Sequence, residues 1–171
     1  LYFAYLLRRG VPVAKIIHEK WFYGLKFYTN RHTLDPRPDT ETLVSAVISD
    51  KIDDNPVRIL DLGTGTGCII CALVKNIANS SGLAIDKSRN ALRIARRNIK
   101  SLGLSKQIQT RHASFEHIGK THDQFDIIVS NPPYIAHNDP RVNDAALHDP
   151  KMALYAKNNG LAAYESIAKN A

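Results

Sequence analysis

Long apolar runs and cysteines are scarce in this chain of 171 residues, which has only two cysteines. No stretch approaches the roughly 18 apolar residues of a membrane helix, and no signal peptide precedes a small-residue cleavage site. Two cysteines are too few for the disulfide framework of a small secreted domain, so we expect a cytoplasmic protein without a membrane partner. The chain also begins at Leu1 without an initiator methionine. We therefore expect it to be a segment of something longer.

Metal-binding patterns are missing as well. The seven histidines show no His-Glu-x-x-His and no other paired ligand spacing, so we expect no metal. The cysteines form Cys68-Ile69-Ile70-Cys71, a Cys-x-x-Cys pattern that can be a redox dithiol. Both middle residues are isoleucine on a helix that must pack on a sheet, so buried small side chains are the better interpretation. The net charge of +7 is a weak hint of an acidic or RNA-rich partner.

Strand and helix patterns alternate in most of the chain. Such alternation predicts βαβ units, that is, a mostly parallel sheet with helices on both faces. The sheet has about four strands, fewer than such domains usually carry, so we expect the missing strands to follow Ala171. The expected strands are 57–62, 83–85, 108–111 and 125–130, and the expected helices are 39–52, 67–79, 88–102 and 160 to the end. Residues 112–124 are expected to be a mixed segment, and a polar loop is expected from Tyr134 to Pro150.

The N-terminal part is organised differently. Residues 1–9 have the pattern of the tail of a helix, which a glycine and a proline end. Aromatic and branched residues flank Gly24 and predict a β-hairpin within residues 16–28. Prolines in residues 33–41 push the backbone out of the helical region and predict a rigid linker. We divide the chain into the end of a helical domain (1–12), a connecting hairpin (13–35) and an α/β domain (36–171).

A glycine-rich loop follows the first strand of the α/β part, Asp61-Leu62-Gly63-Thr64-Gly65-Thr66-Gly67. Its glycines let the backbone approach a ligand closely. The dinucleotide fingerprint needs a third glycine where Cys68 stands, and the P-loop needs a lysine that this loop lacks. Both phosphate-binding interpretations therefore fail. The next strand ends in Asp86, whose carboxylate can accept both ribose hydroxyls of a nucleoside, with a helix cap as the alternative.

The most informative stretch is Asn131-Pro132-Pro133-Tyr134, directly after an apolar strand. Neither proline has an N–H, so the strand ends there and a stiff loop begins. In open α/β sheets the carboxyl ends of the strands are where ligands bind. An amide oxygen, prolyl carbonyls and a stacking ring suit a planar –NH2 group. A turn that merely ends a strand is the alternative for the tetrapeptide alone.

Together these motifs resemble those of the HemK family, the N5-glutamine methyltransferases that modify peptide-chain release factors. The likeness covers almost the whole chain. Residues 34–41 are similar to the family's Ile-Pro-Arg-Pro-Glu-Thr-Glu segment, and Asn131-Pro132-Pro133-Tyr134 is identical to its substrate motif. The resemblance implies a Rossmann-like methyltransferase fold for residues 36–171. It also implies transfer of a methyl group from S-adenosylmethionine to a glutamine side-chain amide of a release factor.

The resemblance further implies roles for single residues. Asn131, Pro132 and Tyr134 would be catalytic and, with Pro133, would bind the glutamine. The Asn131 Oδ1 atom and the Pro132 carbonyl would accept the two amide N–H groups, and Tyr134 would stack on the amide. No strong base is visible, so alignment, which can lower a barrier by about 7–11 kcal/mol, is the expected source of catalysis. The implied cofactor-binding residues are Asp61, Gly63, Thr64, Gly65, Thr66, Gly67, Asp86, Ser114, Phe115 and Asn131.

The chain departs from the family pattern at several positions. Lys15 stands where a tyrosine is common, and Asp35 replaces an apolar residue or proline. Aspartates replace glutamates at Asp39 and Asp149. Ser114-Phe115 replaces an acidic–aromatic pair near the adenine, and a core position is the alternative for the phenylalanine.

Some interpretations remain open at the level of sequence. The competing function is a nucleic-acid methyltransferase (acting on rRNA, tRNA or DNA) that modifies an exocyclic base amine. Such an enzyme usually adds a recognition domain, and the sequence shows none. A non-catalytic cofactor-binding module is disfavoured by the complete substrate loop. Arg37 is a candidate for closing over the site, with a solvated arginine as the alternative. The basic face of residues 89–100 is either solvated or a contact for RNA or an acidic protein.

Overall fold

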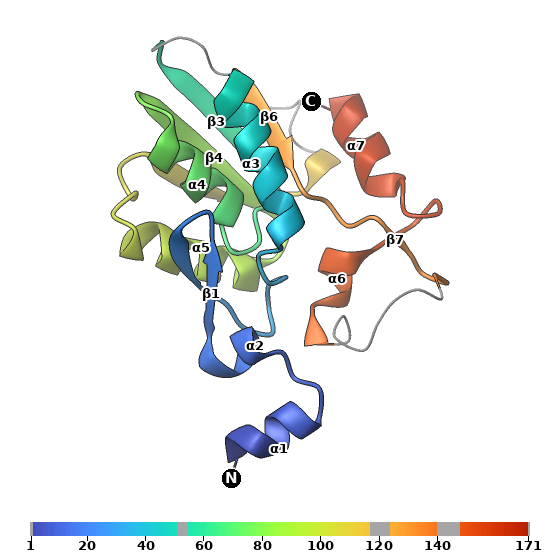
Figure 1. Cartoon of the computed structure of the whole chain (residues 1–171). Coiled ribbons are helices and arrows are strands. Elements are labelled where there is room, and N and C mark those ends of the chain that lie inside the picture. Colours follow the sequence, from blue (N-terminus) through green and yellow to red (C-terminus); the bar gives the residue numbers. More distant parts are fainter. Residues whose placement is uncertain (1, 51–54, 117–123, 140–147, 171) are drawn as a thin grey trace.

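A four-stranded parallel sheet, in the order β5-β4-β3-β6, forms the centre of the protein (Figure 1). The computed structural model describes residues 2–50, 55–116, 124–139 and 148–170. The parallel sheet with its connecting helices confirms the predicted α/β fold. The strands are β3 (Val57–Leu62), β4 (Ser80–Asp86), β5 (Ile108–His112) and β6 (Ile127–Ser130), and the helices that precede β3, β4 and β5 are α3 (Pro38–Asp50), α4 (Cys68–Asn76) and α5 (Arg89–Ser101).

Both faces of the sheet are buried, as is usual for parallel sheets. Side chains alternate along β3, so Ile59 joins the core under α4 while Leu60 and Leu62 join a second cluster on the opposite face. The second cluster packs against Phe125 and against Ile167 of α7 (Ala162–Asn170). The prediction of helices on both faces is therefore confirmed. No helix within the four described ranges is long and apolar enough to cross a membrane.

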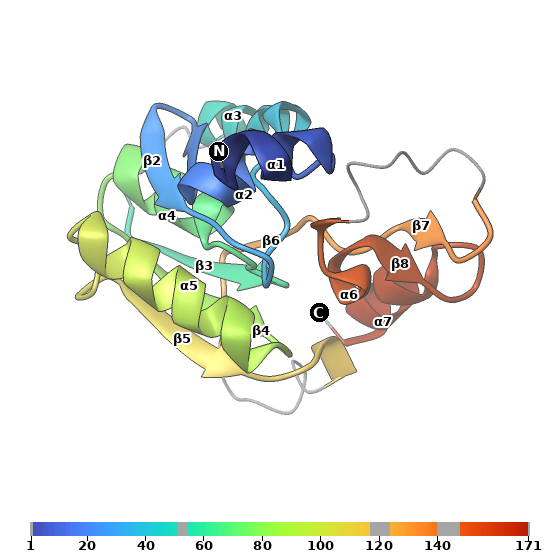
Figure 2. The same ribbon diagram turned by 90° about the horizontal axis from the view of Figure 1, so that it is seen from below.

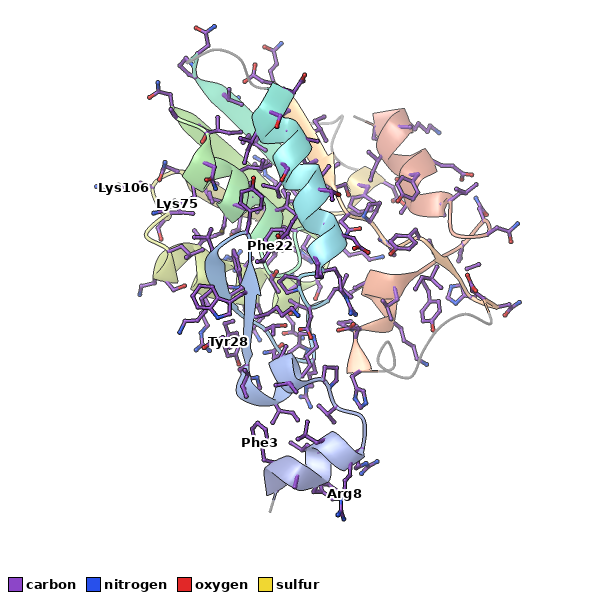
Figure 3. All side chains as sticks on the ribbon, in the orientation of Figure 1. Phe3, Arg8, Phe22, Tyr28, Lys75 and Lys106 are labelled. Carbon is purple, nitrogen blue, oxygen red and sulfur yellow. The ribbon has the colours of Figure 1, made fainter. Side chains whose placement is uncertain are left out.

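The N-terminal part contains the predicted hairpin. Strands β1 (Glu19–Phe22) and β2 (Leu25–Tyr28) pair antiparallel around Gly24, and the buried Phe22 joins the main core (Figure 3). Before it lie α1 (Tyr2–Arg8), which has no buried residue, and α2 (Val13–Ile17). The observed hairpin lies within the predicted range of residues 16–28. The first two residues of that range belong to α2, which was not predicted because a single helical turn has too little periodicity to be recognised.

Several other boundaries differ from the prediction. Strand β4 is longer than residues 83–85, because Ser80 to Gly82 pair with β3 despite their low strand propensity. A Cβ on Gly82 would collide with Ile70 of α4, so the glycine permits this close packing. Strand β6 begins at Ile127, two residues later than predicted. Parts of the expected mixed segment 112–124 and of the expected polar loop before Pro150 lie outside the described residues.

A C-terminal group of short elements lies to one side of the sheet (Figures 1 and 2). It consists of α6 (Lys151–Leu154), α7 and the parallel pair of β7 (Ile135–Ala136) with β8 (Tyr155–Ala156). The prediction of a polar loop from Tyr134 to Pro150 was wrong for β7, which lies in this stretch. A two-residue strand leaves no alternation that sequence reasoning can detect. Residues 131–134 connect this group to the carboxyl end of β6.

Candidate active site

Two cavities meet at Asn131, the first residue after β6. One has a volume of about 540 Å³ and is lined by the glycine-rich loop, Asp86, Ser114 and Phe115. The other has a volume of about 610 Å³ and is lined by Pro132 and Tyr134. The walls that the two cavities share contain Leu34, Arg37, Thr40, Asn131 and Ala153. Asn131 therefore lies where a ligand in one cavity would meet a ligand in the other.

The glycine-rich loop is pinned to the end of β4. The amides of Gly63 and Thr64 both donate to the Ile85 carbonyl, at 2.9 and 3.0 Å. The Gly65 amide donates to Asp86 Oδ2 at 3.0 Å. Gly63 has a φ of +73°, and a Cβ there would lie 3.4 Å from the Phe115 ring. The loop thus presents its backbone to the first cavity while several of its amides already donate inside the protein.

Asp61 lies buried beneath this loop. Thr64 Oγ1 donates to its Oδ2 atom at 2.6 Å. Its Oδ1 atom has no hydrogen-bond partner among the described residues. Burial, with a smaller contribution from the charge of Asp86, raises the pKa of Asp61 to about 7. Asp61 and Gly67 are absent from the lining of both cavities, so their predicted contacts with a cofactor stay predictions.

Asp86 lines the first cavity and braces the loop. Its Oδ1 accepts from the Ser88 amide at 2.8 Å while its Oδ2 accepts from Gly65. Burial raises its pKa, although these two hydrogen bonds act in the opposite direction. The cap of α5 is Ser88, whose hydroxyl accepts from the Ala91 amide, so capping does not account for Asp86. A carboxylate oxygen can accept more than one hydrogen bond, so Asp86 can still receive hydroxyl donors from the cavity.

Ser114 and Phe115 follow β5 and both line the first cavity. Phe115 also packs against the second core cluster and against Gly63. A position in the cavity and a position in the core were alternatives for Phe115. In the structure its ring both lines the cavity and packs against the core. Its predicted contact with an adenine stays a prediction.

The Asn-Pro-Pro-Tyr loop stands between the cavities. Ser130 Oγ donates to the Leu62 carbonyl at 2.7 Å, which ties the end of β6 to the end of β3. Asn131 Nδ2 donates to Thr40 Oγ1 at 3.1 Å. Asn131 and Pro133 line the first cavity, whereas Pro132 and Tyr134 line the second. Tyr134 is 60% exposed, which leaves its ring accessible for stacking.

Sequence reasoning missed residues that support this loop from a distance. Gly160 has a φ of +92°, and a Cβ there would collide with the Tyr134 carbonyl oxygen. It follows Asn158 and Asn159, which also have positive φ values of 53° and 54°. The sequence Asn-Asn-Gly is a turn signal, but nothing in it indicates what the turn packs against. The contact of Thr40 with Asn131 also had no sequence signal.

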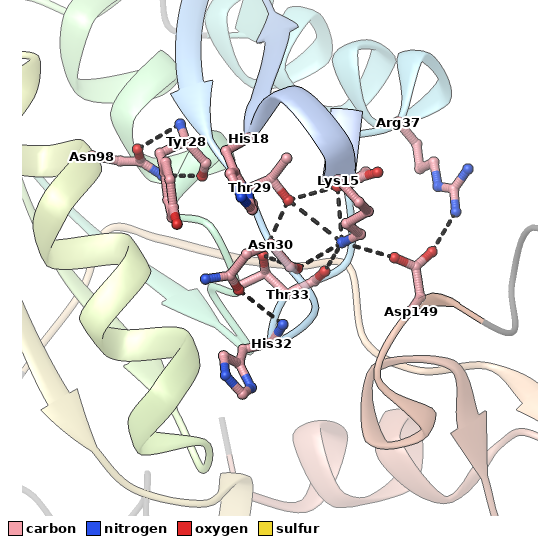
Figure 4. Close-up of polar contacts among 11 residues, drawn as sticks. Lys15, His18, Tyr28, Thr29, Asn30, His32, Thr33, Arg37, Asn98 and Asp149 are labelled. Carbon is pink, nitrogen blue, oxygen red and sulfur yellow. Dashed lines mark hydrogen bonds and ion pairs between the residues drawn. The ribbon is translucent and has the colours of Figure 1, made fainter. Parts of the chain in front are cut away.

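Three of the departures from the family pattern meet in one buried cluster (Figure 4). Lys15 Nζ lies 2.9 Å from Asp35 Oδ1 and 3.0 Å from Asp149 Oδ1. Arg37 donates from Nη2 to the other oxygen of Asp149 at 2.7 Å. In the sequence, Lys15, Asp35 and Asp149 are separate departures from the family pattern. In the structure the charge of Lys15 is paired with the two carboxylates.

The cysteines behave as predicted. Cys68 and Cys71 are free, buried residues of α4. Burial raises the pKa of Cys68 to about 12, which disfavours the thiolate that redox chemistry needs. In the described part of the chain, no three or more histidine, cysteine, aspartate or glutamate side chains form a group that could hold a metal ion.

A glycine-rich loop after β3, an aspartate at the end of β4 and Asn-Pro-Pro-Tyr after β6 define a domain of the S-adenosylmethionine-dependent methyltransferase class. The chain belongs to the methyltransferase small domain family, whose model matches residues 37–158. The SAM-dependent methyltransferase from Agrobacterium tumefaciens has the same fold. The TM-score is 0.56 at 19% identity, over 69% of this chain and 40% of that chain.

Curated relatives confirm the resemblance drawn from the motifs. The release factor glutamine methyltransferase of Agrobacterium fabrum is 42% identical over an alignment of 171 positions, which covers 95% of this chain and 57% of that protein. The enzyme of the same name from Buchnera aphidicola is 42% identical over an alignment of 173 positions, which covers 99% of this chain and 61% of that protein. The chain thus spans less than two thirds of the length of these relatives.

Proposed function

We propose that the whole protein transfers a methyl group from S-adenosylmethionine to the side-chain amide nitrogen of a glutamine in a peptide chain release factor. The observation that carries the proposal is the position of Asn131 between two cavities, one beside the glycine-rich loop and one beside Tyr134. The relatives named release factor glutamine methyltransferase support the choice of substrate.

The first cavity fits the cofactor. Its volume of about 540 Å³ is in the range of small-molecule sites. Asp86 would accept the ribose hydroxyls, and Ser114 and Phe115 would contact the adenine. Asp61 lines neither cavity, but its buried Oδ1 atom has no hydrogen-bond partner among the described residues and would supply negative charge for the cationic methionine end of the cofactor. When bound, the cofactor supplies an electrophilic methyl group on its sulfonium.

The second cavity would hold the glutamine amide. Its nitrogen is a weak nucleophile because the lone pair is delocalised, as the barrier of about 18–20 kcal/mol to amide rotation shows. Thr40 holds Asn131 Nδ2, so Asn131 Oδ1 is the atom left to accept one substrate N–H. The Pro132 carbonyl would accept the other, and Tyr134 would stack on the amide plane. Both acceptors favour the positive charge that develops on nitrogen, so the loop stabilises the transition state without a strong base.

The basic face of α5 gives the nucleic-acid alternative little support. Arg97 lies 3.5 Å from the centroid of the Tyr28 ring. Arg96 Nε donates to Thr110 Oγ1 at 2.7 Å. Arg93 bonds the Asn90 side chain at 3.2 Å. Arginines that already have protein partners are less available to bind phosphates. Methylation of nucleic acid is therefore the competing result in the test below.

We also propose a cytoplasmic location, because free buried cysteines suit a reducing compartment. Residues 36–171 would be the methyltransferase domain, and residues 13–35 would connect it to the end of a helical domain at residues 1–12.

The test uses the full-length protein and cofactor labelled on its methyl group. We expect label in a release factor and none in tRNA, rRNA or DNA. The matched control is the release factor with the methylated glutamine, identified by mass spectrometry, changed to glutamate, which should take up no label. Label in a nucleic acid but not in the release factor would contradict the proposal.

A further inference from the structure

Lys15 places a buried ammonium group between three separate stretches of the chain. Only 7% of the residue is exposed. Its Nζ donates to the Thr33 carbonyl, to the Asn30 carbonyl at 2.8 Å and toward Thr29 Oγ1 at 3.5 Å. With the two carboxylates, five oxygen atoms of described residues thus surround the three protons of the ammonium, and the Thr29 contact is the longest. Asp35 and Asp149, at 2.9 and 3.0 Å, form close ion pairs with Lys15, and Figure 4 shows the pair with Asp149.

The charges in this cluster balance. Lys15 and Arg37 are cationic, whereas Asp35 and Asp149 are anionic and buried. Arg37 is half-exposed, and its Nη2 atom pairs with Asp149 Oδ2. Without Lys15, two carboxylates would remain buried near each other with one peripheral cation. Uncompensated buried charge is strongly unfavourable, so Asp149 would have to move toward water.

Movement of Asp149 would change the first cavity. The residues from Thr33 to Arg37 line one wall of that cavity, and Pro150, Met152 and Ala153 line another. Asp149 directly precedes Pro150, the first residue of the second wall. Its ion pair with Lys15 connects this wall to the stretch of residues 33–37, because Lys15 also contacts Thr33 and Asp35. Lys15 itself lines neither cavity among the described residues. It therefore acts on the site only through the residues that it holds.

We propose that Lys15 is a positioning residue that keeps the two walls of the cofactor cavity together through Asp35 and Asp149. Cofactor affinity then depends on α2, a segment outside the methyltransferase domain. The inference rests on the proposed function insofar as the ligand is S-adenosylmethionine or its product. It does not depend on the identity of the methyl acceptor.

The test measures binding of S-adenosylhomocysteine to the full-length protein by calorimetry, at a temperature where circular dichroism shows each variant folded. We expect Lys15→Met to weaken binding by about tenfold, because only the molecules whose two cavity walls are held together bind the ligand. Hydrogen exchange should rise in residues 148–156. The double variant Lys15→Met/Asp149→Asn also removes the Asp149 carboxylate, which lacks its lysine partner in Lys15→Met. It should bind more tightly than Lys15→Met alone, since an uncompensated carboxylate causes the loss.

The matched control is Lys26→Met, which breaks the exposed Lys26–Glu19 pair of the same N-terminal part. It should leave affinity within about twofold of the wild type, as expected for an exposed pair.

A Lys15→Met protein that melts earlier but binds normally would show a merely structural role and overturn the inference. If Lys15→Met does not fold, Asp149→Asn replaces it, and unchanged affinity there overturns the inference too. Failure of the wild type to bind would count against the proposed function, and hydrogen exchange would still decide the role of Lys15.

Discussion

Asn131 Nδ2 donates to Thr40 Oγ1 at 3.1 Å, which joins the first turn of α3 to the loop after β6. Thr40 is buried, and both residues line both cavities. A side-chain amide whose nitrogen is held by a hydroxyl group directs its oxygen elsewhere. Thr40 therefore determines which end of Asn131 is available to a substrate amide.

Thr40→Val should remove the acceptor while keeping the shape of the side chain. We expect turnover of the full-length protein to fall by about tenfold, the effect of one lost hydrogen bond of about 1.4 kcal/mol, with cofactor affinity unchanged. Thr40→Ser, which keeps the hydroxyl, should retain most activity. Thr42→Val, an exposed change in the same helix, is the control. Wild-type turnover in Thr40→Val would contradict the role given to this hydrogen bond.

Asn131→Ala should have a larger effect, because it removes the acceptor itself. We expect turnover to fall by roughly 10²–10³, as for loss of one transition-state hydrogen bond, with little change in cofactor affinity. Single-turnover methylation with labelled cofactor measures the first quantity, and calorimetry with S-adenosylhomocysteine measures the second. Turnover within a few-fold of the wild type would remove Asn131 from the reaction centre.

Asp61 should make the stability of the protein fall as pH rises. Its pKa is about 7 in the folded protein, against an ordinary value of 3.8. Between these values the folded state keeps a proton that the unfolded state has lost. The free energy of unfolding therefore decreases with pH, by at most about 1.4 kcal/mol per pH unit, and the loss is complete above the folded pKa.

Urea unfolding without cofactor between pH 4.5 and 8 measures this slope. Asp61→Asn should flatten it. Asp86 contributes in the same direction, because burial also raises its pKa, so a smaller slope should remain in the variant. An identical slope in the wild type and in Asp61→Asn would show that Asp61 is not the group that titrates.

Local patterns in the sequence were sufficient to predict the parallel sheet and the segments of the candidate site that directly follow its strands. The glycine-rich loop, Asp86 and the Asn-Pro-Pro-Tyr loop each follow directly from an apolar strand, so their meeting at the carboxyl edge follows from a parallel sheet. Asp86 also fulfils a role that the sequence did not indicate, since it binds the Gly65 amide.

The rest could not be predicted because it depends on contacts between distant parts of the chain. Lys15, Asp35 and Asp149 are ordinary charged residues in sequence and become a balanced cluster only after folding. Asn98 likewise looks like a polar residue on a helix. In the structure it is buried, bonds both backbone groups of Tyr28 and donates to the Thr66 carbonyl at 2.8 Å. It thereby ties the hairpin to the glycine-rich loop.

Gly160 offers a test of whether support from a distant turn matters for catalysis. Gly160→Ala would introduce both backbone strain, at a φ of +92°, and a collision with the Tyr134 carbonyl. Gly103→Ala is the matched control, since Gly103 has a φ of +75° but no atom within 4 Å of an added Cβ. Both changes should lower the free energy of unfolding by about 1–2 kcal/mol through strain alone.

Only Gly160→Ala should displace the Tyr134 backbone, and with it the Pro132 carbonyl two residues earlier in the same loop. We therefore expect its turnover to fall by about tenfold or more, because misalignment of reacting groups by about 1 Å can cost 10²-fold in rate. Gly103→Ala should keep wild-type turnover at a temperature where both variants are folded. Equal turnover in the two variants would mean that the Asn-Pro-Pro-Tyr loop holds its geometry without the turn at Gly160.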